Sequence, residues 1–496
     1  MSSSDVEASL DGDVKYEHAE ELEDVPRIDP ELEKRQAMAL RDRLELVKAP
    51  TDLRWTRIVR KIDCRLLPST AIIYLLCYLD RSNIGNAKIL NSSTNDTLLE
   101  TNNISNYQFT IAMMVFLVAY SVFEAPSNLA LKIFHPRRWL GLLVIAFGSF
   151  CLGIGFTHNF AGLAALRFLL GAAEAGAFPG MIYYFTFWYK PAERASRIAV
   201  FMCSATLSGA FGGAIAYGVG HLNGARGLEG WRWLFLVEGA PTIAAGLLVF
   251  FFLPSYPESV GWLTDEEKKF QALRLGDSGS SGEDKLNWKD AKETLLTGRL
   301  YLHYLTYLTI SAGVASLSLF APTIIAGLGY TDLQAQLFTV PPYAVAYLVT
   351  LGLAWLSDWL KCRGAIACGS QLVASVAFVI QASLPAEAYT ARYAFLIIAT
   401  AGAFGGLPSL NAWVGDNIHT TTARSITTAL NISFSGPGQI IGVWIYRAQD
   451  APAYRLGHGV NAGMSFLAAI LAFCLTLYYR RQNMKMEGTN QTRWVT

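Results

Sequence analysis

Four charged residues lie inside long apolar stretches, where a charge is costly. Asp80 and Arg81 belong to a run that starts at Leu66, and Arg167 and Glu174 belong to the run RFLLGAAEAGAFPG. On insertion scales each such charge at the centre of a membrane helix costs about 2.5–3.5 kcal/mol, so it normally faces a partner or a watery cavity. Arginine offers a permanent planar fork to a carboxylate, whereas a carboxyl group in a low-dielectric site readily takes up a proton. We therefore predict Arg81 and Arg167 as anion-binding residues, and Asp80 and Glu174 as proton-coupling residues.

The spacing of these residues allows them to meet. Arg167 and Glu174 are seven residues apart, hence on one helix face and about 10 Å apart along the axis. We expect all four charges to line one cavity as a coupled titrating group. An anion bound to the arginines would release a carboxylate, which then favours protonation. The alternative is two internal ion pairs that only hold the helices together, although buried ion pairs are poor stabilisers compared with apolar packing.

Other intramembrane polar residues are weaker candidates. Tyr78 precedes Asp80 by two positions and could bind substrate, or could equally face lipid. Asn431 is a plausible ligand contact, and an interhelical hydrogen bond is as good an explanation for it. Glu238 is interpreted as structural.

Twelve apolar segments of bilayer-spanning length must position these residues. With 52% hydrophobic and 16% charged residues, the 496-residue chain has too little charge for a soluble protein of this length, which predicts an all-α membrane protein. The segments are 66–88, 108–131, 138–157, 160–184, 195–220, 232–253, 302–327, 335–357, 364–384, 391–414, 425–446 and 459–479.

The order of six spans, a polar loop and six more spans predicts five parts of the chain. We expect residues 1–50 to form a disordered cytosolic tail, 51–253 an N-terminal six-helix half and 254–298 a cytosolic central loop. Residues 299–480 would form the C-terminal six-helix half, and 481–496 a cytosolic tail. Two such halves are the architecture of the major facilitator superfamily.

Basic residues between the spans give an orientation. They gather before the first span and after the second, fourth, eighth and twelfth spans, so by the positive-inside rule both termini are cytosolic. The loop after the first span carries the N-glycosylation sequons at Asn91, Asn95 and Asn103, which would then lie on the outer face. Chance sequons in an Asn-rich loop are the alternative.

Composition also argues against other classes of protein. The net charge of +1 gives no reason to expect nucleic acid. The seven cysteines are odd in number and lack metal-ligand spacing, so we read them as small buried hydrophobic residues and expect neither a metal nor a cofactor. The sequence contains neither a nucleotide-binding motif nor a hydrolase motif, so we do not expect an enzyme.

Five stretches carry a family resemblance that extends from the first span to the twelfth. YLDRSNIGNA, RFLLGAAEAGAFPG, WYKPAERASR, GWRWLFLVEG and LTDEEK resemble the anion:cation symporter branch of the major facilitator superfamily, particularly fungal allantoate/nicotinate permease-like transporters. The resemblance implies that Asp80, Arg81, Arg167 and Glu174 serve substrate binding and proton coupling, with Tyr78 and Asn431 as weaker candidates.

The expected function follows from the resemblance and the charges. We expect proton-coupled uptake of a small organic anion, such as nicotinate, allantoate or a related nutrient, by a monomeric, multi-pass protein of the fungal plasma membrane. Two alternatives remain open: an exporter of a carboxylated secondary metabolite on the same fold, and a nutrient receptor that binds without transporting.

Overall fold

The computed structural model describes residues 51–275, 288–330, 332–418, 421–486 and 494–495. The predicted disordered tail 1–50 lies outside the described residues, as do residues 487–493 and 496 of the predicted C-terminal tail. The chain forms two units, Met1–Arg60 and Lys61–Thr496. The packing described below is that of the second unit.

The long helices of the structure match the predicted spans in position. They are α2 (Thr51–Ala87), α4 (Asn106–Ile133), α5 (Pro136–Ile154), α6 (Phe160–Glu174) with α7 (Ala177–Thr186), α8 (Pro191–Gly220), α9 (Gly230–Phe252), α12 (Gly298–Ala326), α13 (Asp332–Leu337) with α14 (Val340–Leu360), α15 (Arg363–Ser383), α16 (Tyr389–Gly405) with α17 (Leu407–Asp416), α18 (Thr421–Trp444) and α19 (Arg455–Lys485). Within the described residues, eleven helical segments are long and apolar enough to cross a membrane. The remaining predicted span is helix α18, which is rich in Ser and Thr and is not among the eleven; its 24 residues reach about 36 Å.

Three predicted continuous spans are broken instead. The fourth span is divided between α6 and α7 at Ala175 and Gly176, the eighth between α13 and α14, and the tenth between α16 and α17 at Gly406. The second and third breaks are each followed by a proline in the first helical turn, where its missing N–H is tolerated. The side chain of Ser127 occupies the space into which a Cβ on Gly176 would project, so only glycine fits at the first break.

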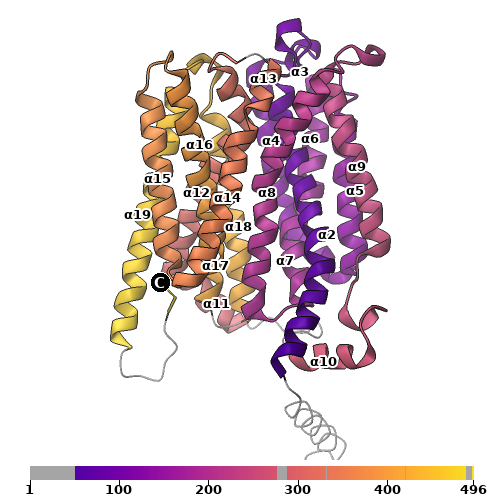
Figure 1. Cartoon of the computed structure of the whole chain (residues 1–496), viewed down its shortest axis with the longest axis vertical. Helices are drawn as coiled ribbons and strands as arrows, with labels where there is room; N and C mark the ends of the chain where they lie inside the picture. Colours follow the sequence, from indigo (N-terminus) through magenta and orange to yellow (C-terminus); the bar gives the residue numbers. More distant parts are fainter. Residues whose placement is uncertain (1–50, 276–287, 331, 419–420, 487–493, 496) are drawn as a thin grey trace, which may run out of the picture. The chain divides into compact units, whose positions relative to one another are not determined.

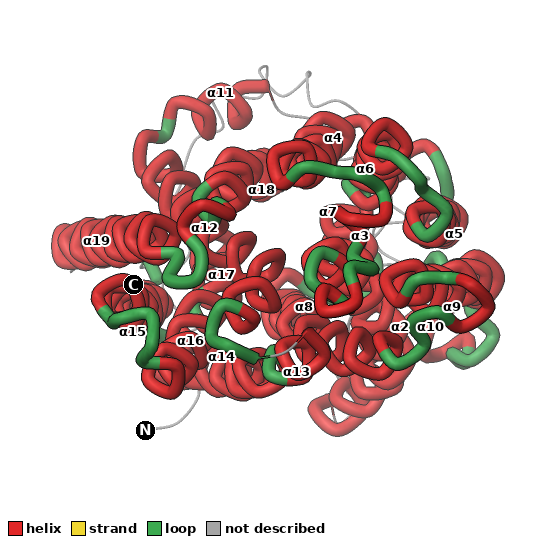
Figure 2. Tube along the Cα trace, turned by 90° about the horizontal axis from the view of Figure 1, so that it is seen from above, coloured by secondary structure: helices red, strands yellow, loops and turns green. Residues whose placement is uncertain are grey.

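The spans gather in two bundles (Figure 1), one from residues 61–252 and one from residues 298–485. The closest packing within the bundles joins α5 to α9, α4 to α6, α15 to α19 and α12 to α18. Gly438 and Gly442 of α18 lie directly against the backbone carbonyls of Leu308 and Ala312 on α12. Between the bundles, α4 packs on α18 and α8 packs on α14, and Figure 2 shows α4 beside α18.

The short elements gather at the two ends of the bundles. η1 (Ser92–Thr94) and α3 (Leu98–Thr101) lie at one end, whereas α10 (Asp265–Leu275) and α11 (Trp288–Leu296) lie at the other (Figure 1). A capping box stands at the start of α10, because Thr264 and Glu267 exchange side chain-to-backbone hydrogen bonds of 2.9 and 3.2 Å. The remaining short turns are η2 (Ala225–Gly227), η3 (Pro257–Ser259) and η5 (Ala448–Asp450).

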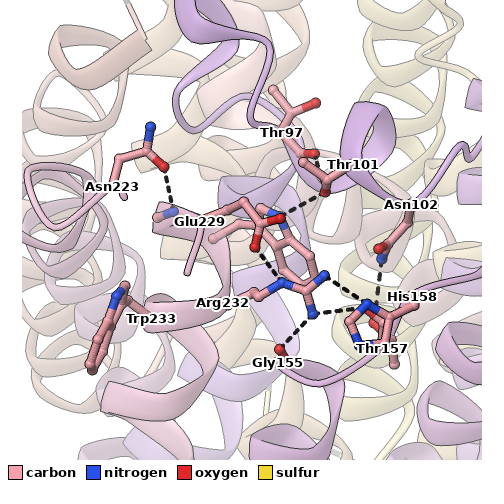
Figure 3. A network of polar contacts seen from close by, with 12 residues as sticks. Thr97, Thr101, Asn102, Gly155, Thr157, His158, Asn223, Glu229, Arg232 and Trp233 are labelled. Carbon is pink, nitrogen blue, oxygen red and sulfur yellow. Dashed lines mark hydrogen bonds and ion pairs between the residues drawn. The ribbon is translucent and has the colours of Figure 1, made fainter. Parts of the chain in front are cut away.

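The arginine of the GWRWLFLVEG stretch anchors loops at the η1 end (Figure 3). Arg232 donates to the backbone carbonyls of Gly155 at 2.9 Å and Thr157 at 2.8 Å, and pairs with Glu229. The neighbouring Trp231 donates its indole N–H to Thr101 of α3 at 3.0 Å. This network fixes the entry of α9, and with it the position of Glu238 two turns further along the helix.

Candidate functional site

A cavity lies between the two bundles, about halfway along their spans. It encloses about 810 Å³ including its open mouth. Both bundles contribute side chains that are mostly aromatic, hydroxyl-bearing or cationic, among them Tyr74, Tyr78, Arg81, Phe116, Tyr120, Arg167, Phe178, Tyr307, Ser311, Ser318, Ser435 and Gln439. Two arginines among aromatic walls make a site for an anion that has apolar surface.

Arg81 reaches the cavity wall and is paired there. Its Nε donates to Oε1 of Glu174 at 3.1 Å, and its guanidinium lies 4.7 Å from the ring centre of Tyr120 and 5.0 Å from that of Tyr78. Helices α2 and α6 run in opposite directions, and side chains lean toward the N-terminus of their own helix. Arg81 and Glu174 therefore lean toward each other, although the sequence placed Glu174 two turns deeper than Arg167.

Arg167 lines the same cavity and has no ionic partner among the described residues. Only 1% of the residue is exposed, its guanidinium lies 4.5 Å from the ring centre of Phe116, and its Nε and Nη1 have no acceptor within the described part of the chain. Arginine stays charged in proteins, and an unmet buried donor is costly. Arg167 is thus prepared for an acceptor that enters the cavity.

The two carboxylates lie behind the wall rather than in it, which corrects the prediction that all four charges line one cavity. Glu174 is fully buried and also accepts from the thiol of Cys77 at 2.9 Å. Asp80 is fully buried and accepts from the thiol of Cys151 on α5 at 3.2 Å. Adjacent residues point about 100° apart around a helix, and here Arg81 lines the cavity whereas Asp80 points to Cys151 of α5.

The weaker candidates divide in the same manner. Tyr78 lines the main cavity and also a second, hydroxyl-rich cavity of about 340 Å³ that lies beside it. Asn431 lines neither cavity; it is 3% exposed and donates to Oδ1 of Asn411 at 3.3 Å, as an interhelical contact would. Ser435, one turn further along α18, does line the main cavity.

Sequence reasoning missed several lining residues. Tyr74 lies one turn before Tyr78 on the same face of α2, so helical periodicity could have found it. Tyr120 on α4 and Gln439 on α18 carried no signal, because aromatic and amide residues are common throughout the spans.

The three sequons differ in their geometry. Asn95 and Asn103 are exposed, whereas Asn91 is 7% exposed and its Nδ2 donates to the backbone carbonyl of Gly220 at 3.1 Å. The glycan would have to replace a hydrogen on this nitrogen. Because this nitrogen is buried, Asn91 is the least accessible of the three predicted sites, and we expect glycans at Asn95 and Asn103 rather than at Asn91.

The side chains of the cavity offer charge and shape to a ligand. Among the described residues no group of His, Cys, Asp and Glu side chains has the arrangement of a metal site. A multi-span helical bundle of two halves that encloses a charged central cavity defines a membrane transporter for a small molecule.

The comparisons with known proteins give the family. Residues 70–443 match the Major Facilitator Superfamily, and the chain belongs to it. It is a secondary transporter with many membrane spans, and not an enzyme.

Relatives support the same assignment. The chain is 52% identical over 431 residues to MFS transporter prlL of Fungal sp. (strain NRRL 50135), covering 86% of this chain and 87% of the relative. It is 34% identical over 448 residues to MFS-type transporter cnsO of Penicillium expansum, covering 87% and 85%. A putative tartrate transporter of Agrobacterium vitis is 36% identical over 300 residues, covering 59% of this chain and 66% of that protein.

Solved structures show the same fold at low identity. A bacterial homologue of the human lysosomal transporter Spinster has a TM-score of 0.62 at 17% identity, over 84% of this chain and 97% of that one. A D-xylose–proton symporter has a TM-score of 0.64 at 15% identity, over 82% and 97%.

Proposed function

We propose that this transporter moves an organic carboxylate bound between Arg81 and Arg167, with Glu174 as the group that couples the movement to a proton. The observation that carries the proposal is the contrast between the two arginines: Arg81 is held by Glu174 at 3.1 Å, whereas Arg167 lines the cavity and has two buried donors, Nε and Nη1, without an acceptor among the described residues. A carboxylate that binds both guanidinium groups displaces Glu174. The displaced carboxylate, buried without its cation, then takes up a proton.

Export of a carboxylated secondary metabolite is the direction that the relatives favour over nutrient uptake. The transporters prlL and cnsO align with 86% and 87% of this chain. The relative named for a nutrient-like acid, tartrate, is aligned with only 59% of this chain. The aromatic walls of the cavity also suit an anion with more apolar surface than tartrate.

Proton coupling is compatible with either direction. One pH unit is worth about 1.4 kcal/mol, equal to a tenfold concentration ratio. Suppose that one proton moves with each monovalent anion. A cell that makes the acid then exports it once the internal concentration of the acid exceeds the external concentration by more than tenfold for each pH unit by which the outside is more acidic. The uptake hypothesis requires the opposite inequality.

The test uses the full-length protein in liposomes, with labelled nicotinate and tartrate as probes and nicotinamide as the uncharged match to nicotinate. We expect movement of a carboxylate, accelerated by a pH gradient and absent for the amide. Equal movement of acid and amide, or indifference to the gradient, would contradict the proposal. Expression in yeast fed the transported acid then gives the direction, because an exporter lowers the cellular content and an importer raises it.

Glu174→Gln tests the coupling step. Glutamine keeps the shape but cannot carry a proton, so we expect gradient-driven accumulation to be lost while exchange of labelled for unlabelled acid continues. Glu266→Gln, on the exposed surface of α10, should behave as the wild type. Equal loss of accumulation and exchange in the Glu174 variant would instead indicate a structural role.

A further inference from the structure

A second cluster of buried polar side chains lies where α2, α5 and α9 meet. Asp80 and Asn83 of α2 are both fully buried, and Glu238 of α9 is 3% exposed. Cys151 of α5 and Thr242 of α9 complete the cluster, and none of the five residues lines either cavity. Figure 1 shows α5 and α9 side by side, away from the second bundle.

The cluster has more hydrogen-bond acceptors than donors. Oδ1 of Asp80 accepts from the thiol of Cys151 at 3.2 Å, and Oε2 of Glu238 accepts from the side-chain amide of Asn83. The hydroxyl of Thr242 donates to the backbone carbonyl of Glu238 at 2.9 Å. Within the described residues, Asp80 Oδ2, Glu238 Oε1 and Asn83 Oδ1 are left without any donor. All three orphaned atoms are acceptors, so what the cluster lacks is a positively charged or hydrogen-bearing group.

No cation compensates the two carboxyl groups at close range. Among the ion pairs of the described residues, none includes Asp80 or Glu238, and Arg81 is paired with Glu174 instead. The titratable groups that act on Asp80 are Cys77 of its own helix, Cys151 from α5, Arg167 and Glu174 from α6, and Glu238 from α9, and the hydroxyl of Thr242 also lies near it. Two ionised carboxylates would repel each other in this buried place. The cost of burying both charges is not offset by an ion pair among the described residues.

We propose that Asp80 and Glu238 together form a cation-binding site, and that its ligand is a single proton held by one or the other of the two carboxyl groups. A proton on either orphaned carboxyl oxygen supplies the missing donor and removes the repulsion. Oxygen ligands alone would also suit Na⁺. A metal ion, however, needs space among its ligands, and these residues line neither cavity, whereas a proton needs no space.

The site is coupled to the anion through Arg167, and this step rests on the proposed function. Arg167 attracts Asp80 electrostatically and also lines the cavity. An anion that binds Arg167 neutralises this attraction, so the carboxyl pair holds its proton more firmly. Binding of the anion and of the proton then strengthen each other by the same factor. Glu238 thereby becomes a proton-binding residue rather than the structural residue inferred from its position in the sequence.

The test measures the thermal stability of the purified full-length protein across pH, which requires no substrate. We expect the melting temperature of the wild type to fall as rising pH removes this proton. Asp80→Asn and Glu238→Gln should each reduce this fall, the double variant should reduce it at least as much as either single variant, and Glu266→Gln should leave it unchanged. The same fall in all variants, or none in the wild type, would overturn the proposal. If NaCl but not KCl restored the wild type at high pH and had no effect on the double variant, the ligand would be Na⁺ and the assignment to a proton would be wrong.

Substitution of Cys151 tests the site without changing a carboxyl group. Cys151→Ala removes the thiol donor that favours the ionised form of Asp80. The midpoint of the fall in melting temperature should therefore move to higher pH by about half to one unit, which is the equivalent of one hydrogen bond. Cys151→Ser should restore the wild-type midpoint. An unchanged midpoint in both variants would contradict the proposal. Failure of the liposome assay would remove the proposed transport activity and leave these stability results standing.

Discussion

At the scale of single residues, identical side chains have different roles because their neighbours differ. Arg81 and Arg167 both line the cavity, yet one is held by Glu174 and the other has unmet donors. The cysteines show a related effect. Cys77 and Cys151 were interpreted as small hydrophobic residues, and the structure instead places their thiols against the two carboxylates that carry the coupling hypothesis.

The chemistry of the unpaired arginine gives a sharp prediction. Arg167→Lys should raise the apparent KM for the transported carboxylate by about 10- to 100-fold, because an ammonium cannot form the two parallel hydrogen bonds of a guanidinium and a charged hydrogen bond contributes about 1.5–3 kcal/mol. Counterflow in liposomes measures the effect. The matched control is Arg138→Lys at the exposed start of α5, which should keep the wild-type KM. An unchanged KM in the Arg167 variant would exclude this residue from binding.

At the scale of helices, hydrophobic length predicted where the spans lie, and local packing decided how they run. The position of each helix follows from a run of apolar residues long enough to cross the bilayer. The breaks that divide three spans were not predicted, because Gly and Pro are tolerated within membrane helices, so their presence alone does not mark an interruption. Ser127 beside Gly176 is a contact between helices that no local pattern contains.

The approach of α12 to α18 gives a prediction at this scale. Gly438→Ala should lower the stability of the protein by about 1–3 kcal/mol, because the added methyl group would meet the carbonyl of Leu308. A lower melting temperature of the purified protein is the expected result. Gly463→Ala on α19, where no neighbouring atom lies within 4 Å of the new methyl group, is the control. Equal melting temperatures for the two variants would show that the contact is not a tight one.

At the scale of the whole transporter, the two bundles meet at the η1 end through polar contacts. Asp332 at the start of α13 accepts from the hydroxyl of Ser92 and the backbone N–H of Ser93, both at 2.7 Å. Gln336, one turn on, donates to the backbone carbonyl of Asn86 at 3.0 Å. These contacts close the η1 end of the interface between the bundles, and a transport cycle that admits substrate from this end must break them.

Glycosylation tests the proposed orientation of this end. If this end faces the lumen during synthesis, Asn95→Gln and Asn103→Gln should each remove glycan from the protein made in yeast. Each variant would then migrate faster than the wild type on a gel, and glycosidase treatment would abolish the difference. Asn91→Gln should not change migration, because its buried amide is held by Gly220. A glycan on Asn91 would contradict the geometry described for this residue. The absence of glycan at all three sites would contradict the orientation.

The sequence by itself determined the class of this protein. Apolar runs of bilayer length, the polar interval between two sets of six, and charges retained at a cost inside the spans all follow from transfer free energies that act residue by residue. The same local reasoning singled out Arg81 and Arg167, which line the cavity; that they bind the substrate stays a prediction.

Only the tertiary structure decided which charge meets which. The direction of a side chain depends on the rotation and polarity of its helix, so Asp80 and Arg81, adjacent in the chain, belong to different sites. The meeting of Asp80 with Glu238 depends on the packing of α2, α5 and α9. A sequence records neither that rotation nor that packing, because both arise from contacts between residues far apart along the chain.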